Sequence, residues 1–471
     1  MTLSPILVIC LMLGSVLLVV GLFRPFLGML VFLVIHFVQP GELVPALDPL
    51  RIELVYGTLL TGVLVYRRVT IPGRSLLSDK ILLSAVLLIG AGLLSVPFSV
   101  WRGGAVNTVI DMVKLVTLLF LLTLMVDSVA RLRMTLWCLA AMATWFAGSG
   151  LSAYAQGQFY ALGKLNRAEG VNSLAGNPNQ LAGLLLALLP LLIALFRSSH
   201  NIFARILLLT CSGLSLVAIS LTGARIVAIA LIALAVFYTL QSKHKFSTFL
   251  GCVLIACLIW HWLPVEYKQR YLTVEQYAQG GELDASNELR LEIWRAGRQI
   301  FFKYPIFGVG AGQFPTAYGM IILAGRHAGW MNPHNLLIQV ACELGIIGLI
   351  VFGNFLWQII KGMADVIRRK RIRAIELNRQ VAIACAAMFV GIVIVSTVSH
   401  TLYGPYWYVL GGLVAANRNI LRAKLQRRAK LQAASNGSSD NLPKEEQDVS
   451  LVGAPTSTVL SRLQRHDSDE C

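Results

Sequence analysis

Long apolar segments occupy most of this chain, and they constrain its fold more strongly than any motif. Hydrophobic residues make up 56% of the 471 positions and charged residues only 13%, a balance that soluble domains do not show. The apolar runs cover residues 4–22, 25–38, 51–66, 81–99, 107–126, 134–152, 179–196, 206–222, 225–240, 248–264, 333–360, 380–398 and 403–417. Several runs are shorter than the roughly 20 residues that a helix perpendicular to the bilayer needs. The sequence therefore predicts an all-α, polytopic transmembrane helical bundle with about 12 spans.

The basic residues alternate from side to side along this pattern. The chain carries a formal net charge of +17, and most Lys and Arg residues lie in every second loop. Because cytoplasmic loops are enriched in these residues, the loops between them are expected to face outward. The predicted outward loops are residues 39–50, 100–106, 153–177, 222–225 and 265–332. Topology thus explains the charge, and membrane lipids rather than nucleic acid are the expected partners.

Three parts of the chain are predicted. Residues 1–417 form a transmembrane helical domain, and residues 265–332 within it form one large periplasmic loop with amphipathic helical stretches. Residues 418–471 form a cytoplasmic tail that is first basic and then disordered, because its later part lacks sustained apolar periodicity. The glycine-rich stretch 307–314 lacks the preceding strand and the GK[ST] ending of a nucleotide site. We interpret it as a tight turn at the membrane surface.

His334 is the first candidate for chemistry. Asn332 is a favourable N-cap and Pro333 a favourable first helical residue, so a long helix is predicted to begin here with His334 in its first turn. Helical periodicity places His334 on one face with the small residues Ala341, Gly345 and Gly348, which permit close helix packing. The positive end of the helix dipole disfavours protonation of this histidine and favours a nearby anion. A neutral histidine beside an anion can act as a general base, although an interfacial histidine without a catalytic role has the same local pattern.

Three arginines accompany this histidine on the predicted outward side. Arg225 lies in a short turn between two apolar runs, where an arginine is costly unless it meets an anion, a protein cavity or the interface. Arg290 lies on a predicted amphipathic helix, and Arg167 precedes the turn at 177–179. Snorkelling of Arg225 and solvation of Arg290 on a surface helix are the structural alternatives.

Together these residues favour one class of reaction. Guanidinium groups bind diphosphate oxygens bidentately without a metal, and a neutral histidine can deprotonate a hydroxyl. The eight cysteines show neither disulfide nor metal-site spacing, so no metal or other cofactor is expected. Since nucleotide sugars are not normally supplied outside the cytoplasm, a transferase that faces outward needs a lipid-linked donor. The sequence therefore predicts a metal-independent enzyme that uses such a donor.

The segment HNLLIQVACELGIIG at 334–348 resembles the signature of the O-antigen ligase and O-antigen polymerase superfamily, in which His-Asn precedes Gly-x-x-Gly. Further matches are the SLTGAR turn that ends at Arg225, the R-x-x-x-W pattern at Arg290 and Trp294, the YPIFGVGAGQF stretch, and the NPN turn at 177–179. The resemblance covers residues 167–355 closely and the number of spans loosely.

This resemblance implies a GT-C-like glycosyltransferase of the bacterial inner membrane that acts at the periplasmic face. Its donor would be a glycan on undecaprenyl diphosphate, and its acceptor lipid A-core or a growing polysaccharide. By analogy, His334 would be the base and Arg225 and Arg290 would bind the diphosphate, with Arg167 and Asn335 as further substrate-binding residues. Arg326 in the large loop is an alternative to either clamping arginine.

Several alternatives stay open from the sequence. Within the superfamily, a ligase and a polymerase fit about equally well, and a protein O-oligosaccharyltransferase fits less well because the tail is predicted to be cytoplasmic. From other classes, a polysaccharide or anion transporter would also need charge within the membrane, but at the bilayer midplane. A noncatalytic scaffold would tolerate substitution of the histidine and the arginines.

Overall fold

The computed structural model describes residues 5–70, 78–162, 165–278, 285–322, 330–368 and 376–439. The helices are α1 Pro5–Phe23, α2 Pro25–Val38, α3 Pro40–Leu43, α4 Ile52–Thr70, α5 Lys80–Ser95, α6 Arg102–Met125, α7 Val129–Ala155, α8 Pro178–Ser198, α9 Ile202–Leu221, α10 Arg225–Gln241, α11 Lys245–Trp262, α12 Val265–Ala278, α13 Ala285–Lys303, α14 Phe314–Ala317, α15 Leu336–Ile367, α16 Glu376–Ser396 and α17 Pro405–Ser439. Three short helical turns are η1 Pro45–Leu50, η2 Val96–Phe98 and η3 Tyr318–Ile322. The strands β1 Tyr160–Leu162 and β2 Leu165–Arg167 pair antiparallel.

The chain divides into two units, residues 1–420 and 421–471. In the second unit, α17 continues as a helix to Ser439. The disorder predicted from about residue 432 is wrong for residues 432–439, which belong to α17, and residues 440–471 lie outside the described residues. The predicted division of the chain at residue 417 stays a prediction.

The fold is an all-α, polytopic membrane protein, as predicted. Within the described residues, nine helices are long and apolar enough to cross a membrane. Three shorter apolar helices, Gly14–Phe23, Pro25–Val38 and Arg225–Gln241, accompany them. The figure of about 12 spans stays a prediction.

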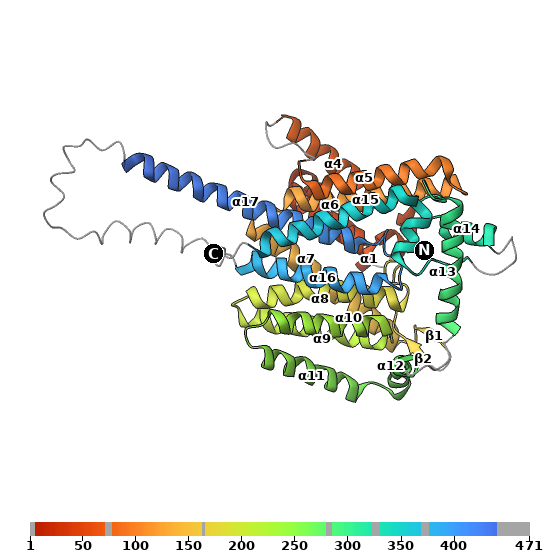
Figure 1. Cartoon of the computed structure of the whole chain (residues 1–471). Helices are drawn as coiled ribbons and strands as arrows, with labels where there is room; N and C mark the ends of the chain where they lie inside the picture. The colour runs from red at the N-terminus through yellow and green to blue at the C-terminus, as the bar shows by residue number, and fades with distance from the viewer. Residues whose placement is uncertain are drawn as a thin grey trace, which may run out of the picture. The chain divides into compact units, whose positions relative to one another are not determined.

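Two helices show how burial is distributed in the first unit. Nearly every residue of α8 is buried, because it packs against α7, α9 and α16 on different sides. A helix that is apolar all round is expected at such a central position. By contrast, α11 has no buried residue in its described length and packs against α10 at the edge of the unit (Figure 1). Its exposed apolar side chains are suited to contact with lipid tails.

Helix α15 is interrupted at Gly345, whose backbone has φ 65° and ψ −160°. The glycine-rich turn at 307–314 packs against this interruption. Val309 N donates to Cys342 O over 2.8 Å and Gly310 N donates to Glu343 O over 3.1 Å. Because the hydrocarbon region offers no water to backbone groups released by a broken helix, these bonds satisfy them within the protein.

The side chain of Glu343 on α15 adds two hydrogen bonds to this contact. It accepts a hydrogen bond from Gly312 N over 3.0 Å and one from the Tyr403 hydroxyl over 2.6 Å. Tyr403 belongs to the segment between α16 and α17. Three segments that are distant in the sequence are therefore joined at the kink of α15.

Three predictions about this region are corrected. Helix α15 begins after Asn335, whose side chain accepts from Ile338 N over 3.1 Å, so the predicted start at Asn332 is wrong. His334 consequently lies outside the helix with a positive φ of 45°. The predicted continuous small-residue face is also wrong, because the break at Gly345 redirects the helix and the missing Cβ makes room for the backbone of Ile306 rather than for another helix. The predicted tight turn at 307–314 is present, but it packs against α15 just before the interruption at Gly345.

The loops that were predicted to share the outward side lie together at one end of the first unit. The bonds that join them are Ser173 Oγ to Glu42 Oε1 at 2.6 Å, Val100 N to Val309 O at 3.1 Å, and Arg270 Nε to Gly223 O at 2.8 Å. Figure 1 shows β1, β2, α12 and α13 at this end. The alternation of basic loops therefore correctly predicted that these loops lie on one side of the first unit.

Candidate active site

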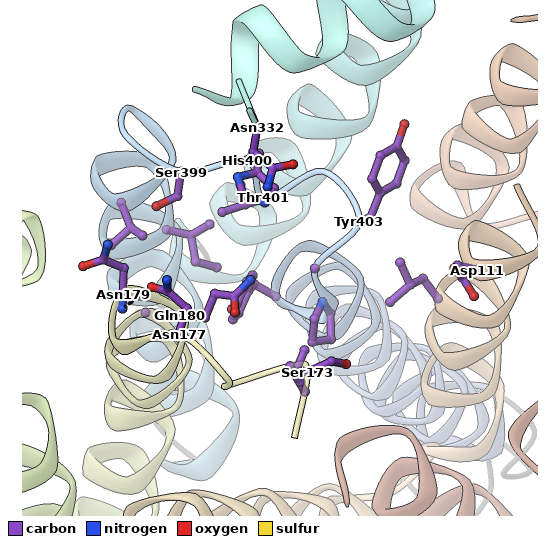
Figure 2. Close-up of a pocket in the computed structure, with 18 of the residues that line it drawn as sticks. Asp111, Ser173, Asn177, Asn179, Gln180, Asn332, Ser399, His400, Thr401 and Tyr403 are labelled. Atoms are coloured by element: carbon purple, nitrogen blue, oxygen red, sulfur yellow. Dashed lines mark hydrogen bonds between the residues drawn. The ribbon is translucent and has the colours of Figure 1, made fainter. Parts of the chain in front are cut away.

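A cavity of about 590 Å³ opens at this end of the bundle. Its lining includes His334 and Asn332 before α15, His400 and Tyr403 between α16 and α17, and polar side chains from α2, α4, α6 and α8. Figure 2 shows Asp111 on one side of the cavity and Asn177, Asn179 and Gln180 on the other, with Asn332 and His400 between them in this view. The cavity is large enough for a monosaccharide unit, and its lining combines polar side chains with apolar ones such as Leu115, Ile392 and Val395.

His334 lies in the wall of this cavity in a strained backbone conformation. Its φ of 45° is in the left-handed region, which non-glycine residues adopt mainly where surrounding structure holds them there. Its ring centroid is 5.6 Å from that of His400, in an edge-to-face arrangement. Burial, and then the neighbouring His400 and Arg290, lower the pKa of His334 from 6.5 to about 4. At neutral pH the ring is therefore uncharged and can accept a proton.

Arg290 is brought close to His334 by helix α13. It is partly buried, and its charge contributes to the lowered pKa of His334, so the two side chains lie within electrostatic range of each other. Arg290 is not among the side chains that line the cavity. The alternative Arg326 lies outside the described residues.

A second group of arginines surrounds the turn before α10. The Arg167 guanidinium donates from Nε to Thr222 O over 2.6 Å and from Nη2 to Asn179 Oδ1 over 2.9 Å. Burial, and then the nearby charge of Arg270, lower the pKa of Arg167 to about 10. Arg225 is partly buried and forms the first residue of α10 directly after this turn. The turn therefore carries a local excess of positive charge that suits an anion.

Gly223 makes the approach of Arg270 possible. Its φ is 59°, and an added Cβ would lie 3.2 Å from Arg270 Cδ. Sequence reasoning missed Arg270, because it resembles any other basic residue of a polar helix. The only signal was its aromatic neighbourhood, in which Tyr267 and Tyr271 flank it. Tyr271 donates to Ser220 O over 3.2 Å and Tyr267 donates to Asn166 O, so these bonds fix α12 against the end of α9 and against β2.

The side chain of Asn335 forms hydrogen bonds within the protein. Its Oδ1 caps α15, and its Nδ2 donates to Thr397 O over 3.0 Å. It is not among the residues that line the cavity, so its contacts give it a positioning role for the segment that carries His334. Binding of substrate by Asn335 stays a prediction.

Sequence reasoning also missed His400 and Tyr403. Both lie in the stretch SHTLYGPY between the last two apolar runs, where polar and aromatic residues are concentrated. That concentration was the available signal. Burial lowers the pKa of His400 as well, so the paired imidazoles both favour the neutral form.

No three His, Cys, Asp or Glu side chains in the described ranges are arranged to hold a metal ion.

Replacing Arg167 by methionine is expected to lower the free energy of unfolding by about 2–4 kcal/mol, because two charged hydrogen bonds are lost and their partners are left buried. Thermal unfolding of the detergent-solubilised protein measures this. Arg133→Met is the matched control, since Arg133 is exposed and its replacement leaves those bonds intact. An unchanged melting temperature for Arg167→Met would show that this arginine does not hold the turn.

The comparisons with known proteins locate the similarity in the same part of the chain. Residues 210–353 match the O-antigen ligase family. This segment contains Arg225, Arg270, Arg290 and His334, together with the kink at Gly345.

A protein of Rickettsia conorii that carries polysaccharide ligase as a provisional name is 24% identical over 154 residues, which are 31% of this chain. The match spans 33% of that relative, so the chain covers about a third of its length. Both comparisons relate part of the chain to proteins whose names denote a ligase. Residues 210–353 are therefore similar to the O-antigen ligase family.

Proposed function

We propose that this chain is a metal-independent glycosyltransferase that moves a glycan from undecaprenyl diphosphate to a saccharide hydroxyl. The acceptor is lipid A-core or a growing polysaccharide, and the active site faces the periplasm from the bacterial inner membrane. The observation that carries this proposal is the uncharged His334 in the wall of a cavity that polar side chains also line, with Arg290 within electrostatic range. The family match of residues 210–353 supports the same reaction class.

In this mechanism His334 accepts the proton of the acceptor hydroxyl while the hydroxyl oxygen attacks the anomeric carbon of the donor. A new glycosidic bond forms as the bond between the anomeric carbon and the phosphate oxygen breaks, and the diphosphate leaves with the electron pair. Arg290 and the positively charged turn around Arg225 balance the charge that develops on this leaving group. The low pKa of His334 keeps the base unprotonated in the presence of these cations.

Arg290→Ala is expected to raise the KM for the lipid-linked donor by about 10- to 100-fold, because a charge-assisted contact with the diphosphate is lost. Steady-state transfer by the reconstituted enzyme at varied donor concentration measures this effect. Arg298→Ala is the matched control, because Arg298 lies two turns further along the same helix and is exposed. Equal donor KM values for Arg290→Ala and the wild type would exclude Arg290 from donor binding.

The proposed function is tested by reconstituting the wild type in liposomes with an undecaprenyl-diphosphate-linked glycan and lipid A-core. Glycan attached to the core is expected for a ligase, and longer lipid-linked chains are expected for a polymerase. Mass spectrometry of the extracted lipids distinguishes these products. If folded protein formed neither product, the proposed function would be wrong.

A further inference from the structure

The cavity has a second polar wall, formed by helices at the beginning of the chain. Glu42 on α3, Glu53 on α4, and Asp111 and Lys114 on α6 all line it, together with His36 on α2. We call this group the acidic wall. No motif predicts it, because its members come from helices far apart in the sequence and outside the family match at 210–353.

Apart from Glu42, the members of the acidic wall form an ion-paired network rather than a set of separate surface charges. Lys114 Nζ lies 2.7 Å from Asp111 Oδ1 and 3.8 Å from Glu53 Oε2. His36 Nδ1 lies 2.5 Å from Glu53 Oε1. The side chains of Lys114 and Glu53 are only 24% and 19% exposed. Placing ionisable groups on apolar membrane helices is costly, so groups retained there are candidates for function.

Two residues of this wall have hydrogen-bonding capacity that the network does not use. His36 is about nine-tenths buried, with a side-chain exposure of 11%, and its Nε2 has no hydrogen-bond partner in the part of the chain that the structure describes. Asp111 uses Oδ1 for Lys114, yet its side chain remains 60% exposed beside the cavity (Figure 2). Glu42, in contrast, is occupied by the Ser173 backbone N and hydroxyl, each at 2.6 Å, and holds that loop.

The sign of the charge decides which ligand fits. Three carboxylates stand against one ammonium group, and even a protonated His36 would leave the wall negative. A diphosphate is therefore repelled here, whereas the arginines described above attract it. Carboxylate oxygens accept hydrogen bonds from hydroxyl and ammonium groups, which neutral sugars and amino sugars provide.

We propose that the acidic wall is the acceptor subsite, which binds an uncharged or amine-bearing terminal sugar and rejects sugars that carry carboxylate or phosphate. The assignment of this bound sugar as the acceptor rests on the proposed function. Charge thus separates the two substrates. The donor diphosphate binds at the arginines, which are not among the side chains that line this cavity, and the acceptor sugar binds at the acidic wall, in the cavity that His334 also lines. Repulsion between the carboxylates of the wall and an acidic sugar provides part of this selectivity.

The test measures binding without turnover, in the full-length protein in nanodiscs. The probes are three disaccharides that differ at one position of the terminal ring, which carries a hydroxyl, an amine or a carboxylate. Wild type is expected to bind the hydroxyl and amine forms at least about tenfold more tightly than the carboxylate form, since one repulsive charge contact is worth about 1–4 kcal/mol. Ligand-observed NMR titration supplies the dissociation constants.

Variants then identify the wall as the source of this selectivity. Asp111→Asn is expected to reduce the discrimination to about threefold or less, because one of the repelling charges is removed. Asp127→Asn is the matched control: Asp127 is also 60% exposed and paired with a basic residue one turn away, but it does not line the cavity. Glu53→Gln provides a second variant inside the network.

Two results would overturn the proposal: equal binding of all three disaccharides by the wild type, or the same loss of discrimination in Asp127→Asn and Asp111→Asn. Asp111 is exposed and the substitution preserves its shape, so folding of this variant is readily checked by its melting temperature. Because no donor is present, failure of this test is distinct from failure of the transfer assay. Discrimination without transfer would support a sugar site and refute the proposed reaction.

Discussion

Replacing His334 by alanine is expected to lower the turnover number by about 10²- to 10⁴-fold, which is the usual contribution of a positioned general base. Donor binding should change little, because the arginines that attract the diphosphate are retained. The measurement is single-turnover transfer by the reconstituted enzyme at saturating donor. His200→Ala is the control for loss of a histidine, since His200 is exposed in the loop between α8 and α9.

The same residue predicts the pH dependence. Since burial and the neighbouring His400 and Arg290 lower the pKa of His334 to about 4, its neutral form dominates from neutral pH down to mildly acidic pH. The value of kcat/KM should therefore stay flat on acidification and fall only near that pKa, by about tenfold for each further pH unit. An acid limb near the ordinary pKa of histidine, or full activity of His334→Ala, would contradict the proposed role of this residue.

The fold class was predictable because it depends on properties that are local in the sequence. Apolar runs predict membrane helices wherever they occur, since lipid imposes the same requirement on each of them. The alternation of Lys and Arg assigned the loops 39–50, 153–177, 222–225 and 265–332 to one side, and hydrogen bonds do join these loops. The approach of Arg290 to His334 follows from this shared side together with the position of α13 across it.

The start of α15 was not predictable, although the local signals were good. The sequence MNPHN offers two asparagines as N-caps, and the pair Asn332-Pro333 is the better local match. The structure uses Asn335, because its side chain both caps the helix and donates to Thr397 O in a segment 62 residues away. A tertiary contact therefore determines which of the two asparagines caps the helix. With Asn335 as the cap, the backbone of His334 lies in the left-handed region.

The acidic wall and His400 were missed for a related reason. His36, Glu53 and Lys114 each occur singly in apolar surroundings, and nothing in the sequence indicates that three separate helices bring them together. Spacing rules detect groups on one helix or in one loop. A site assembled from several helices becomes visible only when their packing is known.

The kink of α15 gives the largest expected effect on stability. The sequence shows only a glycine within an apolar run, but its conformation depends on the turn at 307–314, more than thirty residues earlier. A Cβ at position 345 would lie 2.2 Å from Ile306 O and 2.4 Å from Ile306 C, which are backbone atoms that cannot rotate away. A φ of 65° with a ψ of −160° is in addition a region that essentially only glycine occupies.

Gly345→Ala is therefore expected to prevent stable folding or to lower the free energy of unfolding by more than about 3 kcal/mol, since backbone strain and the clash add. Thermal unfolding monitored by size-exclusion chromatography in detergent measures this. Gly353→Ala on the same helix is the matched control, because no heavy atom lies within 4 Å of the added Cβ and alanine favours the helix. If Gly345→Ala were as stable as Gly353→Ala, α15 would run straight through this position. The turn at 307–314 would then lose its hydrogen bonds to Cys342 and Glu343, and with them its support for the loop that carries Tyr403 and His400 beside the base.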